Sequence, residues 1–241
     1  MSLLKNEIGA AKEGFMTRTI ATIAACIILL AVLAFLFSNH HTQAGTATLP
    51  APAVDDVLAA TSGQQTIVLA GGCFWGIQAV FEHVKGVTSA TAGYAGGTAQ
   101  TADYETVSSG DTGHAESVKV VYDPSKITLG QILRVFFSVA HDPTELDRQG
   151  PDYGKQYRSA IFYTSENQKK IAQAYINQLT QAKVFTSPIV TQLNSNSAFY
   201  EAEAYHQDYA TKHPDNPYII FNDAPKVDHL RQQFPDLYKA Q

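Results

Sequence analysis

The feature that most restricts how this chain can fold is a long apolar stretch near its N-terminus. The nineteen residues from Thr19 to Phe37 contain no Asp, Glu, Lys, Arg or His. A helix of this length spans roughly 28 Å, which matches the hydrocarbon thickness of a bilayer. A helix buried in a soluble domain would keep one polar face, and this stretch has none. We therefore predict one transmembrane anchor helix over residues 19–38, with the globular fold after it.

Basic residues flank this stretch on one side only. Three of them precede it, namely Lys5, Lys12 and Arg18, and the next Lys or Arg is Lys85. The positive-inside bias then predicts a single-pass membrane protein, with residues 1–18 as a cytoplasmic tail and the bulk of the chain extracytoplasmic. A cleaved signal peptide is the alternative, since a weak cleavage motif follows the stretch, but its apolar core would be shorter.

The residues after the apolar stretch divide into a linker and one domain. Residues 39–64 are mostly small and polar, which predicts a flexible linker. Residues 65–241 have the length of a single globular domain. The chain is 45% hydrophobic with a net charge of −5, so we expect neither disorder nor a nucleic-acid partner bound through bulk positive charge. Its two cysteines, Cys26 and Cys73, cannot form a disulfide scaffold.

The domain alternates short strands with amphipathic helices. We predict four strands, at residues 66–70, 87–93, 116–122 and 158–164. Apolar residues three and four apart predict a helix after the first strand. Capping boxes predict further helices after Thr128-x-x-Gln131 and Ser165-x-x-Gln168. The order β-α-β-β-α-β is that of the split βαβ, ferredoxin-like arrangement. The predicted fold class is α+β, a ferredoxin-like core with extra C-terminal segments and one preceding transmembrane helix.

One cysteine stands at the junction of the first strand and the first helix, in the run Gly71-Gly72-Cys73-Phe74-Trp75-Gly76. The unpaired N–H groups and the dipole at a helix N-terminus lower the pKa of a thiol and favour the thiolate. Phe74 and Trp75 could line an apolar pocket beside the sulfur. A buried structural thiol is the alternative interpretation, but the flanking glycines and aromatic rings favour a nucleophile.

Further motifs follow this run in a fixed order. They are Gly93-Tyr94-Ala95-Gly96-Gly97, Tyr104-Glu105-Thr106-Val107, Thr112-Gly113-His114-Ala115-Glu116, His141-Asp142-Pro143-Thr144, residues 148–159 and Tyr205-His206-Gln207-x-Tyr209. With this series, over roughly residues 65–215, the chain resembles the peptide-methionine (S)-S-oxide reductases, the A class of methionine sulfoxide reductases. The resemblance implies an oxidoreductase that repairs proteins after oxidative stress.

The resemblance also implies roles for three neighbouring residues. Cys73 matches the nucleophile of the family, and Phe74 and Trp75 match the aromatic residues that hold the S-methyl group of the substrate. Attack of a thiolate on the sulfoxide sulfur pushes negative charge onto the oxygen. It leaves methionine and a sulfenic acid on Cys73.

Four more residues match groups around the sulfoxide oxygen. Glu116 matches the carboxyl group that protonates this oxygen, and burial would raise its pKa as that role requires. Tyr104 and Tyr157 match two hydroxyls that share the task. Asp152 matches an acidic residue near the substrate that efficient turnover needs. Each of them alone could be an ordinary structural residue, so the prediction depends on their joint spacing.

Three histidines occur in the matched motifs: His114, His141 and His206. A Cys–His thiol hydrolase would need one of them beside Cys73. We expect instead that they are structural side chains with hydrogen-bonded ring nitrogens. The sequence contains no metal-binding spacing, and we expect neither a metal ion nor a cofactor.

The chain departs from many relatives because it lacks a resolving cysteine. No cysteine follows Cys73, and Cys26 lies in the predicted membrane helix. The sulfenic acid must then be reduced by an external thiol, and we expect a thioredoxin-like or glutaredoxin-like protein or a small thiol as the reductant. The expected substrate is methionine sulfoxide in oxidised proteins. The alternative functions are a membrane-tethered Cys–His thiol hydrolase and a tethered, non-catalytic binder of oxidised methionine.

Overall fold

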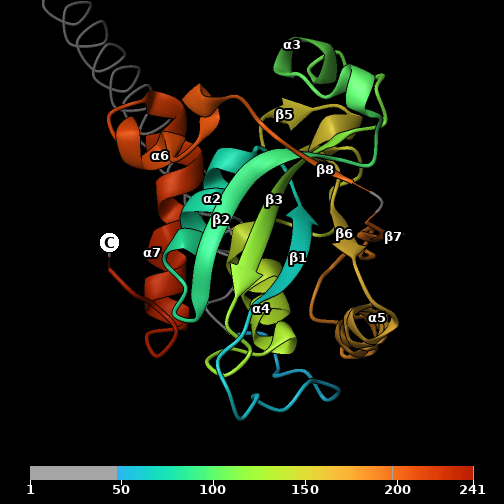
Figure 1. Ribbon diagram of the computed structural model, residues 1–241, viewed down its shortest axis with the longest axis vertical. Helices are drawn as coiled ribbons and strands as arrows, with labels where there is room; N and C mark the ends of the chain where they lie inside the picture. Colours follow the sequence, from blue (N-terminus) through green and yellow to red (C-terminus); the bar gives the residue numbers. More distant parts are fainter. Residues whose placement is uncertain (1–47, 197, 241) are drawn as a thin grey trace, which may run out of the picture. The chain divides into compact units, whose positions relative to one another are not determined.

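The computed structural model describes residues 48–196 and 198–240 (Figure 1). The predicted tail 1–18, the predicted anchor 19–38 and the first residues of the predicted linker lie outside this range, so the anchor and its orientation stay predictions. Among the helices that are described, none has the length and apolarity needed to cross a bilayer.

A strongly curved six-stranded sheet forms the centre of the domain (Figure 1). Its strands lie in the order β7-β6-β1-β3-β2-β8, and only the pair β6–β7 is parallel. Their bounds are β1 Gln65–Ala70, β2 Val87–Ala95, β3 Ala115–Tyr122, β6 Ala160–Tyr163, β7 Gln192–Ser195 and β8 Phe199–Glu201. The order β6-β1-β3-β2 of the four antiparallel strands is that of a split βαβ core, and the predicted α+β class is confirmed. The edge strands β7 and β8 complete a mixed sheet.

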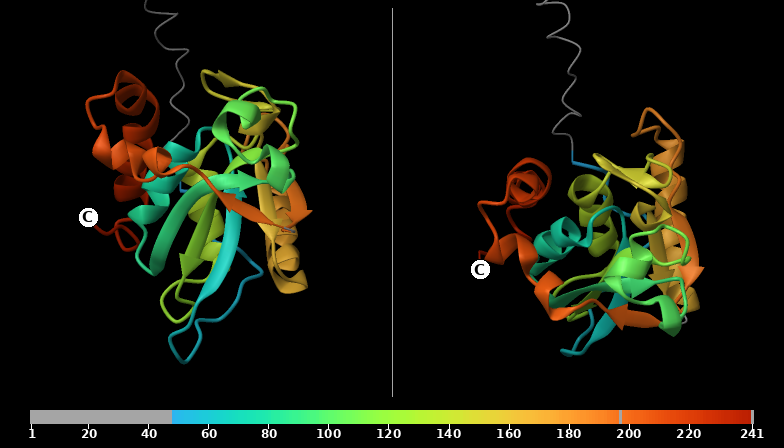
Figure 2. Two further views of the ribbon diagram at one scale, coloured as in Figure 1. Left: turned by 45° about the horizontal axis from the view of Figure 1, so that its top comes forward. Right: turned by 90° about the horizontal axis from the view of Figure 1, so that it is seen from above.

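The main helices are α2 Phe74–Glu82, α4 Leu129–Val135, α5 Glu166–Gln181 and α7 Ala224–Gln233. Shorter elements are the helices α3 Tyr104–Val107 and α6 Tyr209–Lys212, the strands β4 Arg148–Gln149 and β5 Asp152–Tyr153, the 3-10 helices η1 Ala99–Thr101, η3 Lys155–Tyr157 and η4 Ala204–His206, and the π-helices η2 Phe136–Ala140 and η5 Ile219–Asp223. Helix α2 packs on β2 and β3, and the C-terminal elements α6, η5 and α7 pack alongside α2 (Figure 2).

The last four residues of the central strand β1, Ile67 to Ala70, are apolar and fully buried because both faces of the strand are covered there. Ile67 and Leu69 belong to the large core between the sheet and the helices. Val68 and Ala70 point to the opposite face, where they pack with Phe162 in a smaller cluster. This two-residue alternation is the geometry of a strand. It fixes the end of β1, and with it the position of the turn that leads to Cys73.

One of the two predicted capping boxes is complete and the other is half formed. Thr128 Oγ1 accepts a hydrogen bond from the Gln131 N–H at 3.2 Å, and Gln131 Oε1 accepts one from the Thr128 N–H at 3.0 Å. Ser165 caps α5 through the Gln168 N–H, but Gln168 Oε1 accepts from the Thr164 N–H instead. The Gln168 amide also donates to a carbonyl of β1, so this side chain joins α5 to the sheet.

The described part of the predicted linker, residues 48–64, makes hydrogen bonds to the domain. These residues contain no helix or strand. The Asp55 carboxylate accepts hydrogen bonds from the Gly130 N–H at 2.8 Å and the Thr128 hydroxyl at 2.6 Å, at the start of α4. The Tyr175 hydroxyl donates to a carbonyl of the same segment at 2.9 Å. These attachments use backbone and polar groups, so no apolar periodicity in the sequence reveals them.

Candidate active site

Cys73 lies where the sequence predicts it, between β1 and α2, as the N-cap residue of α2. The turn before it depends on Gly72, whose φ of +98° belongs to the left-handed region that favours glycine. A Cβ at this position would also overlap the side chain of Gln149. The backbone here therefore approaches a neighbouring segment too closely for any side chain. The Cys73 side chain is largely covered, with 8% of the residue exposed.

The environment of the Cys73 thiol contradicts the expected lowering of its pKa. Burial raises the pKa of this thiol well above its usual value, and the nearby carboxyl groups of Glu116 and Asp223 raise it further. The Trp75 N–H at the start of α2 and the Lys226 ammonium act in the opposite direction. The helix N-terminus therefore lowers the pKa of the thiol as expected, but burial raises this pKa by more.

Glu116 comes from β3 and lies directly beside the start of α2. Its Oε2 atom accepts a hydrogen bond from the Phe74 N–H at 3.1 Å, and only 3% of the residue is exposed. Burial raises the pKa of this carboxyl group to about 8, although the Phe74 N–H opposes the rise. The carboxyl group therefore keeps its proton at neutral pH, in the direction expected from the sequence.

The two predicted phenols approach the same space from different elements. Tyr104 is the first residue of α3, and Tyr157 is the last residue of η3. Burial raises the pKa of both hydroxyls, and in each case the charges of Glu116 and Cys73 raise it further. Both phenols therefore lie close enough to Glu116 and Cys73 to feel their charges, and both stay neutral at pH 7.

Asp152 joins the site through a partner that sequence reasoning missed. It lies in β5, and its Oδ2 atom accepts a short hydrogen bond from the hydroxyl of Tyr218. Burial raises the pKa of the Tyr218 hydroxyl, and the charges of Cys73 and Asp152 raise it further, so this ring also lies near the sulfur. Tyr218 directly precedes η5, in a part of the sequence where the predicted elements are weak.

The two predicted substrate-binding rings differ in their exposure. Phe74 is 1% exposed, and its ring packs against Tyr94 and His206. Trp75 is partly exposed, and its ring stacks on Tyr209 with centroids 3.8 Å apart. The Trp75 indole N–H donates to His206 Nδ1 at 3.2 Å. Of the two rings beside Cys73, Trp75 is therefore the one that reaches solvent, and Phe74 belongs to the core.

The histidines of the motifs mostly have structural partners. Both ring nitrogens of His114 bond to the backbone of residues 97–98, and both of those of His141 are hydrogen-bonded, one of them to the Ser159 hydroxyl at 2.8 Å. Burial lowers the pKa of His141 to about 4, so it is neutral at pH 7. Within residues 48–196 and 198–240, no histidine hydrogen-bonds to Cys73 and no group of His, Cys, Asp and Glu is placed to hold a metal ion.

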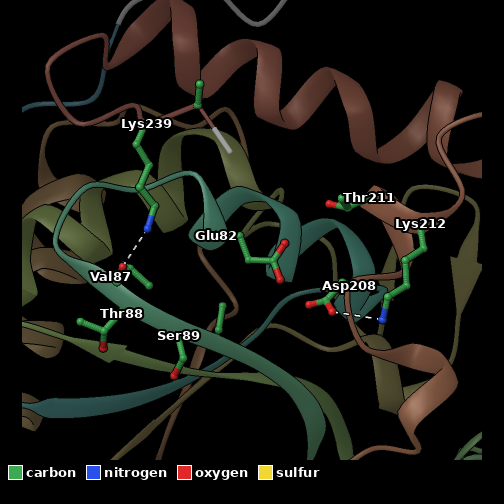
Figure 3. Close-up of a pocket in the computed structure, with 10 residues that line it drawn as sticks. Glu82, Val87, Thr88, Ser89, Asp208, Thr211, Lys212 and Lys239 are labelled. Carbon is green, nitrogen blue, oxygen red and sulfur yellow. Dashed lines mark hydrogen bonds and ion pairs between the residues drawn. The ribbon is translucent and has the colours of Figure 1, made fainter.

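A hollow lies at the opposite end of α2 from Cys73 (Figure 3). It has a volume of about 610 Å³ and is lined by charged and hydroxyl side chains that include Glu82, Asp208, Lys212 and Lys239. Lys212 pairs with Asp208 at 3.1 Å. Because Glu82 ends the helix that Cys73 begins, the hollow is roughly 13 Å from the sulfur along the helix axis. It contains none of the predicted site residues.

The comparisons with known proteins all indicate one family. The family model described as "Peptide methionine sulfoxide reductase" matches residues 65–238. "Peptide methionine sulfoxide reductase MsrA 2" of Mesorhizobium japonicum is 58% identical over 179 residues, which cover 74% of this chain and 92% of that protein. The Synechocystis protein of the same name is 48% identical, over 89% of this chain and 99% of that protein.

Two solved structures share the fold. Reduced Mxr1 from Saccharomyces cerevisiae has a TM-score of 0.56 and 33% identity, over 66% of this chain and 93% of that chain. Methionine sulfoxide reductase A of Corynebacterium diphtheriae has a TM-score of 0.54 and 36% identity, over 70% of this chain and 84% of that chain. With the matched motifs and the site geometry, these likenesses identify an enzyme: the chain belongs to the peptide methionine sulfoxide reductase family and is a methionine sulfoxide reductase of the A class.

Proposed function

We propose that the protein reduces the S epimer of methionine sulfoxide, free and in oxidised proteins, with Cys73 as the nucleophile and Glu116 as the acid. The observation that carries this proposal is the pairing of a buried thiol with a buried carboxyl group whose pKa is raised to about 8. A carboxyl group that is still protonated at neutral pH can donate to a sulfoxide oxygen, whereas an ordinary carboxylate cannot.

The proposed step transfers one oxygen atom and two electrons. The Cys73 sulfur attacks the sulfoxide sulfur while Glu116 gives a proton to the sulfoxide oxygen. This attack forms a transient S–S bond to the substrate. The hydroxyl group then moves to the Cys73 sulfur: the substrate S–O bond and the transient S–S bond break, a new S–O bond forms on Cys73, and methionine leaves. Methionine sulfur is reduced by two electrons, Cys73 is oxidised by two electrons to a sulfenic acid, and the thiol proton returns to Glu116.

Glu116 has a second effect in this scheme. Its negative charge, when present, raises the pKa of the Cys73 thiol. At pH 7 the carboxyl group is neutral and no longer raises the pKa of the thiol. The acid form of Glu116 therefore favours both the ionisation of Cys73 and the protonation of the sulfoxide oxygen. The hydroxyls of Tyr104 and Tyr157 are half-buried and neutral, so they can donate further hydrogen bonds to the oxygen as negative charge develops on it.

The S-methyl group needs an apolar surface on the other side of the sulfur. We assign this surface to Trp75, which is partly exposed and held flat by Tyr209, with Phe74 as the support beneath it. Aromatic rings make favourable contacts with sulfur and methyl groups. Asp152 accepts a hydrogen bond from Tyr218 and is assigned to positioning the substrate.

The sulfenic acid on Cys73 requires an external reductant in this proposal. Cys73 is the free cysteine of the described residues, and Cys26 falls in the predicted anchor. One external thiol would form a mixed disulfide with Cys73 and release water, and a second thiol would release Cys73. We propose a thioredoxin-like or glutaredoxin-like protein or a small thiol for this role. With an anchor at residues 19–38 and an extracytoplasmic domain, this reductant would have to act outside the cytoplasm.

One assay tests the proposed function against its alternatives. The purified full chain is incubated with S or R methionine sulfoxide and dithiothreitol, and methionine is measured. We expect turnover of the S epimer only, its loss in Cys73→Ser, and full activity in the control Cys26→Ser. Turnover that survives in Cys73→Ser would remove the nucleophile, and binding without turnover would favour a non-catalytic binder. Acyl-ester cleavage that needs Cys73 would favour the hydrolase.

Mass spectrometry tests how the oxidised enzyme is resolved. Protein treated with the S sulfoxide but no thiol should carry a sulfenic acid, or its dimedone adduct, on Cys73. An intramolecular disulfide between Cys26 and Cys73 would contradict an external reductant.

A further inference from the structure

An ion pair at the junction of η5 and α7 lies deep in the protein. The Lys226 ammonium is 3.1 Å from Asp223 Oδ1, and the exposed fractions of the two side chains are 18% and 0%. Asp223 Oδ2 is buried and has no hydrogen-bond partner among the described residues. Removing two charges from water is costly, and buried pairs are seldom worth more than apolar side chains of the same size. Stability alone is therefore a weak explanation for this pair.

The pair presses against the first turn of α2. A Cβ at Gly76 would overlap Asp223 Oδ1 and would stand 2.7 Å from Lys226 Nζ. Gly76 is the third residue of α2, and Cys73 is the N-cap residue of the same helix. The final glycine of the Gly-Cys-Phe-Trp-Gly run thus leaves room for the two charged groups. Their charges are brought within one helical turn of the sulfur.

Charged and titratable groups from several elements surround Cys73. They are Glu116 of β3, Asp223 of η5, Lys226 of α7, Tyr104 of α3, Tyr157 of η3, and Tyr218. In the part of the chain that the structure describes, Lys226 is the one cation among the groups that shift the pKa of this thiol. All the other charges in the set are negative when ionised, so they oppose a thiolate.

We propose that the Asp223–Lys226 pair sets the ionisation of the Cys73 sulfur. Lys226 supplies the positive charge that favours the thiolate during attack on the sulfoxide. Asp223 holds Lys226 against α2, and its negative charge limits how far Lys226 lowers the pKa of the thiol. Both are positioning residues, because neither touches the substrate. This inference rests on the proposed function, since it assigns a task to the nucleophile of that reaction.

The test is the pH dependence of the reaction between Cys73 and iodoacetamide, followed by mass spectrometry of the Cys73 peptide in the full chain. Lys226→Met should raise the pKa of the thiol by about one unit and Asp223→Asn should lower it by about one unit, as expected for a nearby charge. Lys226→Arg should keep the profile of the unaltered protein. The matched control is the exposed pair of Asp228 and Arg231 on the same helix, where Asp228→Asn and Arg231→Met should leave the profile unchanged.

Opposite shifts are the signature of the proposal, because a pair that only stabilises the fold would give no shift, or the same shift in both variants. Either of those results, in variants that melt cooperatively, would overturn the inference. Lys226→Met leaves a buried carboxyl group unpaired and can unfold the protein. The double variant with Asp223→Asn avoids this, and its thiol pKa should lie above that of Asp223→Asn alone. Opposite shifts in a protein without turnover would refute the proposed function. The control of Cys73 ionisation by the pair would stand, and its task in attack on the sulfoxide would fall.

Discussion

Two stretches of sequence meet at the candidate active site, and they differ in how the chain encodes them. Residues 72–157 supply the thiol, Glu116, both phenols and Asp152 from motifs at the ends of strands and short helices. Residues 206–226 supply His206, Tyr209, Tyr218 and the Asp223–Lys226 pair from short helical segments and the start of α7. In our proposal the residues of the first stretch (the first set) carry out the reaction. Those of the second stretch (the second set) position these side chains and set the ionisation of the Cys73 thiol. The difference teaches that nearby motifs can reveal the reacting groups without revealing what supports them.

The largest expected effect tests the first set. Glu116→Gln keeps a group that can accept from the Phe74 N–H but removes the acid proton, so we expect kcat/KM to fall about 10²–10⁴-fold. In the unaltered enzyme, activity should decline as the pH rises through about 8, because Glu116 then loses its proton. A pH–rate profile checks both points. Glu105→Gln, on the exposed side of α3, is the control and should keep full activity. Full activity in Glu116→Gln would remove the proposed acid.

The same carboxyl group affects stability in a way that can be measured separately. The pKa of Glu116 is higher in the folded than in the unfolded protein, so its contribution to stability is complete below about 4.5 and is lost as the pH rises through about 8. The free energy of unfolding should fall over that range by no more than about 5 kcal/mol on this account. Urea unfolding of Glu116→Gln should show a flatter dependence, and an unchanged slope would contradict the assignment.

The contact between the two stretches can be broken at a single position. Gly76→Ala places a methyl group against Asp223 and Lys226, and overpacking of this kind costs about 1–3 kcal/mol of unfolding free energy. Urea denaturation measures the loss. The control is Gly63→Ala, where the new methyl group would meet only Pro124 at an ordinary distance of 3.8 Å. If Gly76→Ala is as stable as the control, the close approach of the ion pair to α2 is wrong.

A smaller effect is expected from the second set alone. Tyr218→Phe removes the hydroxyl that donates to Asp152 and should lower kcat/KM about tenfold, the size of one hydrogen bond to a charged group. Tyr209→Phe is the matched control, since its ring would still stack on Trp75 and its hydroxyl has no contact with Asp152. Steady-state kinetics on peptide sulfoxides separates the two variants, and equal losses would show that the hydroxyl of Tyr218 has no special task.

The smallest effect concerns a segment that lies outside both stretches. Asp55→Ala removes the carboxylate that accepts from the Gly130 N–H and the Thr128 hydroxyl, and should lower the unfolding free energy by about 1 kcal/mol. We expect kcat/KM to stay unchanged, because Asp55 belongs to neither half of the site. A large loss of activity would mean that the segment before β1 influences the site.

Several parts of the fold follow from local signals in the sequence. The alternation of Glu116 to Tyr122 predicts β3, the Thr128-x-x-Gln131 pattern predicts a capping box, and both are present. The glycine pair before Cys73 predicts the turn between β1 and α2. These succeed because each depends on contacts among residues that are close in the chain. The box at Ser165 is only half formed because it also depends on a residue distant in the chain. The Gln168 side chain donates a hydrogen bond to a carbonyl of β1.

The sequence by itself determined where the proposed reacting groups lie in the chain: a cysteine at a helix start, a glutamate on a strand, two tyrosines and an aspartate at family spacing. Only the tertiary structure decided the pKa values of those groups and which side chains surround them. It showed that burial raises the pKa of Cys73 where a helix start alone would lower it, and that Tyr218, Asp223 and Lys226 arrive from a distant segment. The physical reason is that motif patterns record local geometry, whereas desolvation and charge depend on everything that packs around an atom.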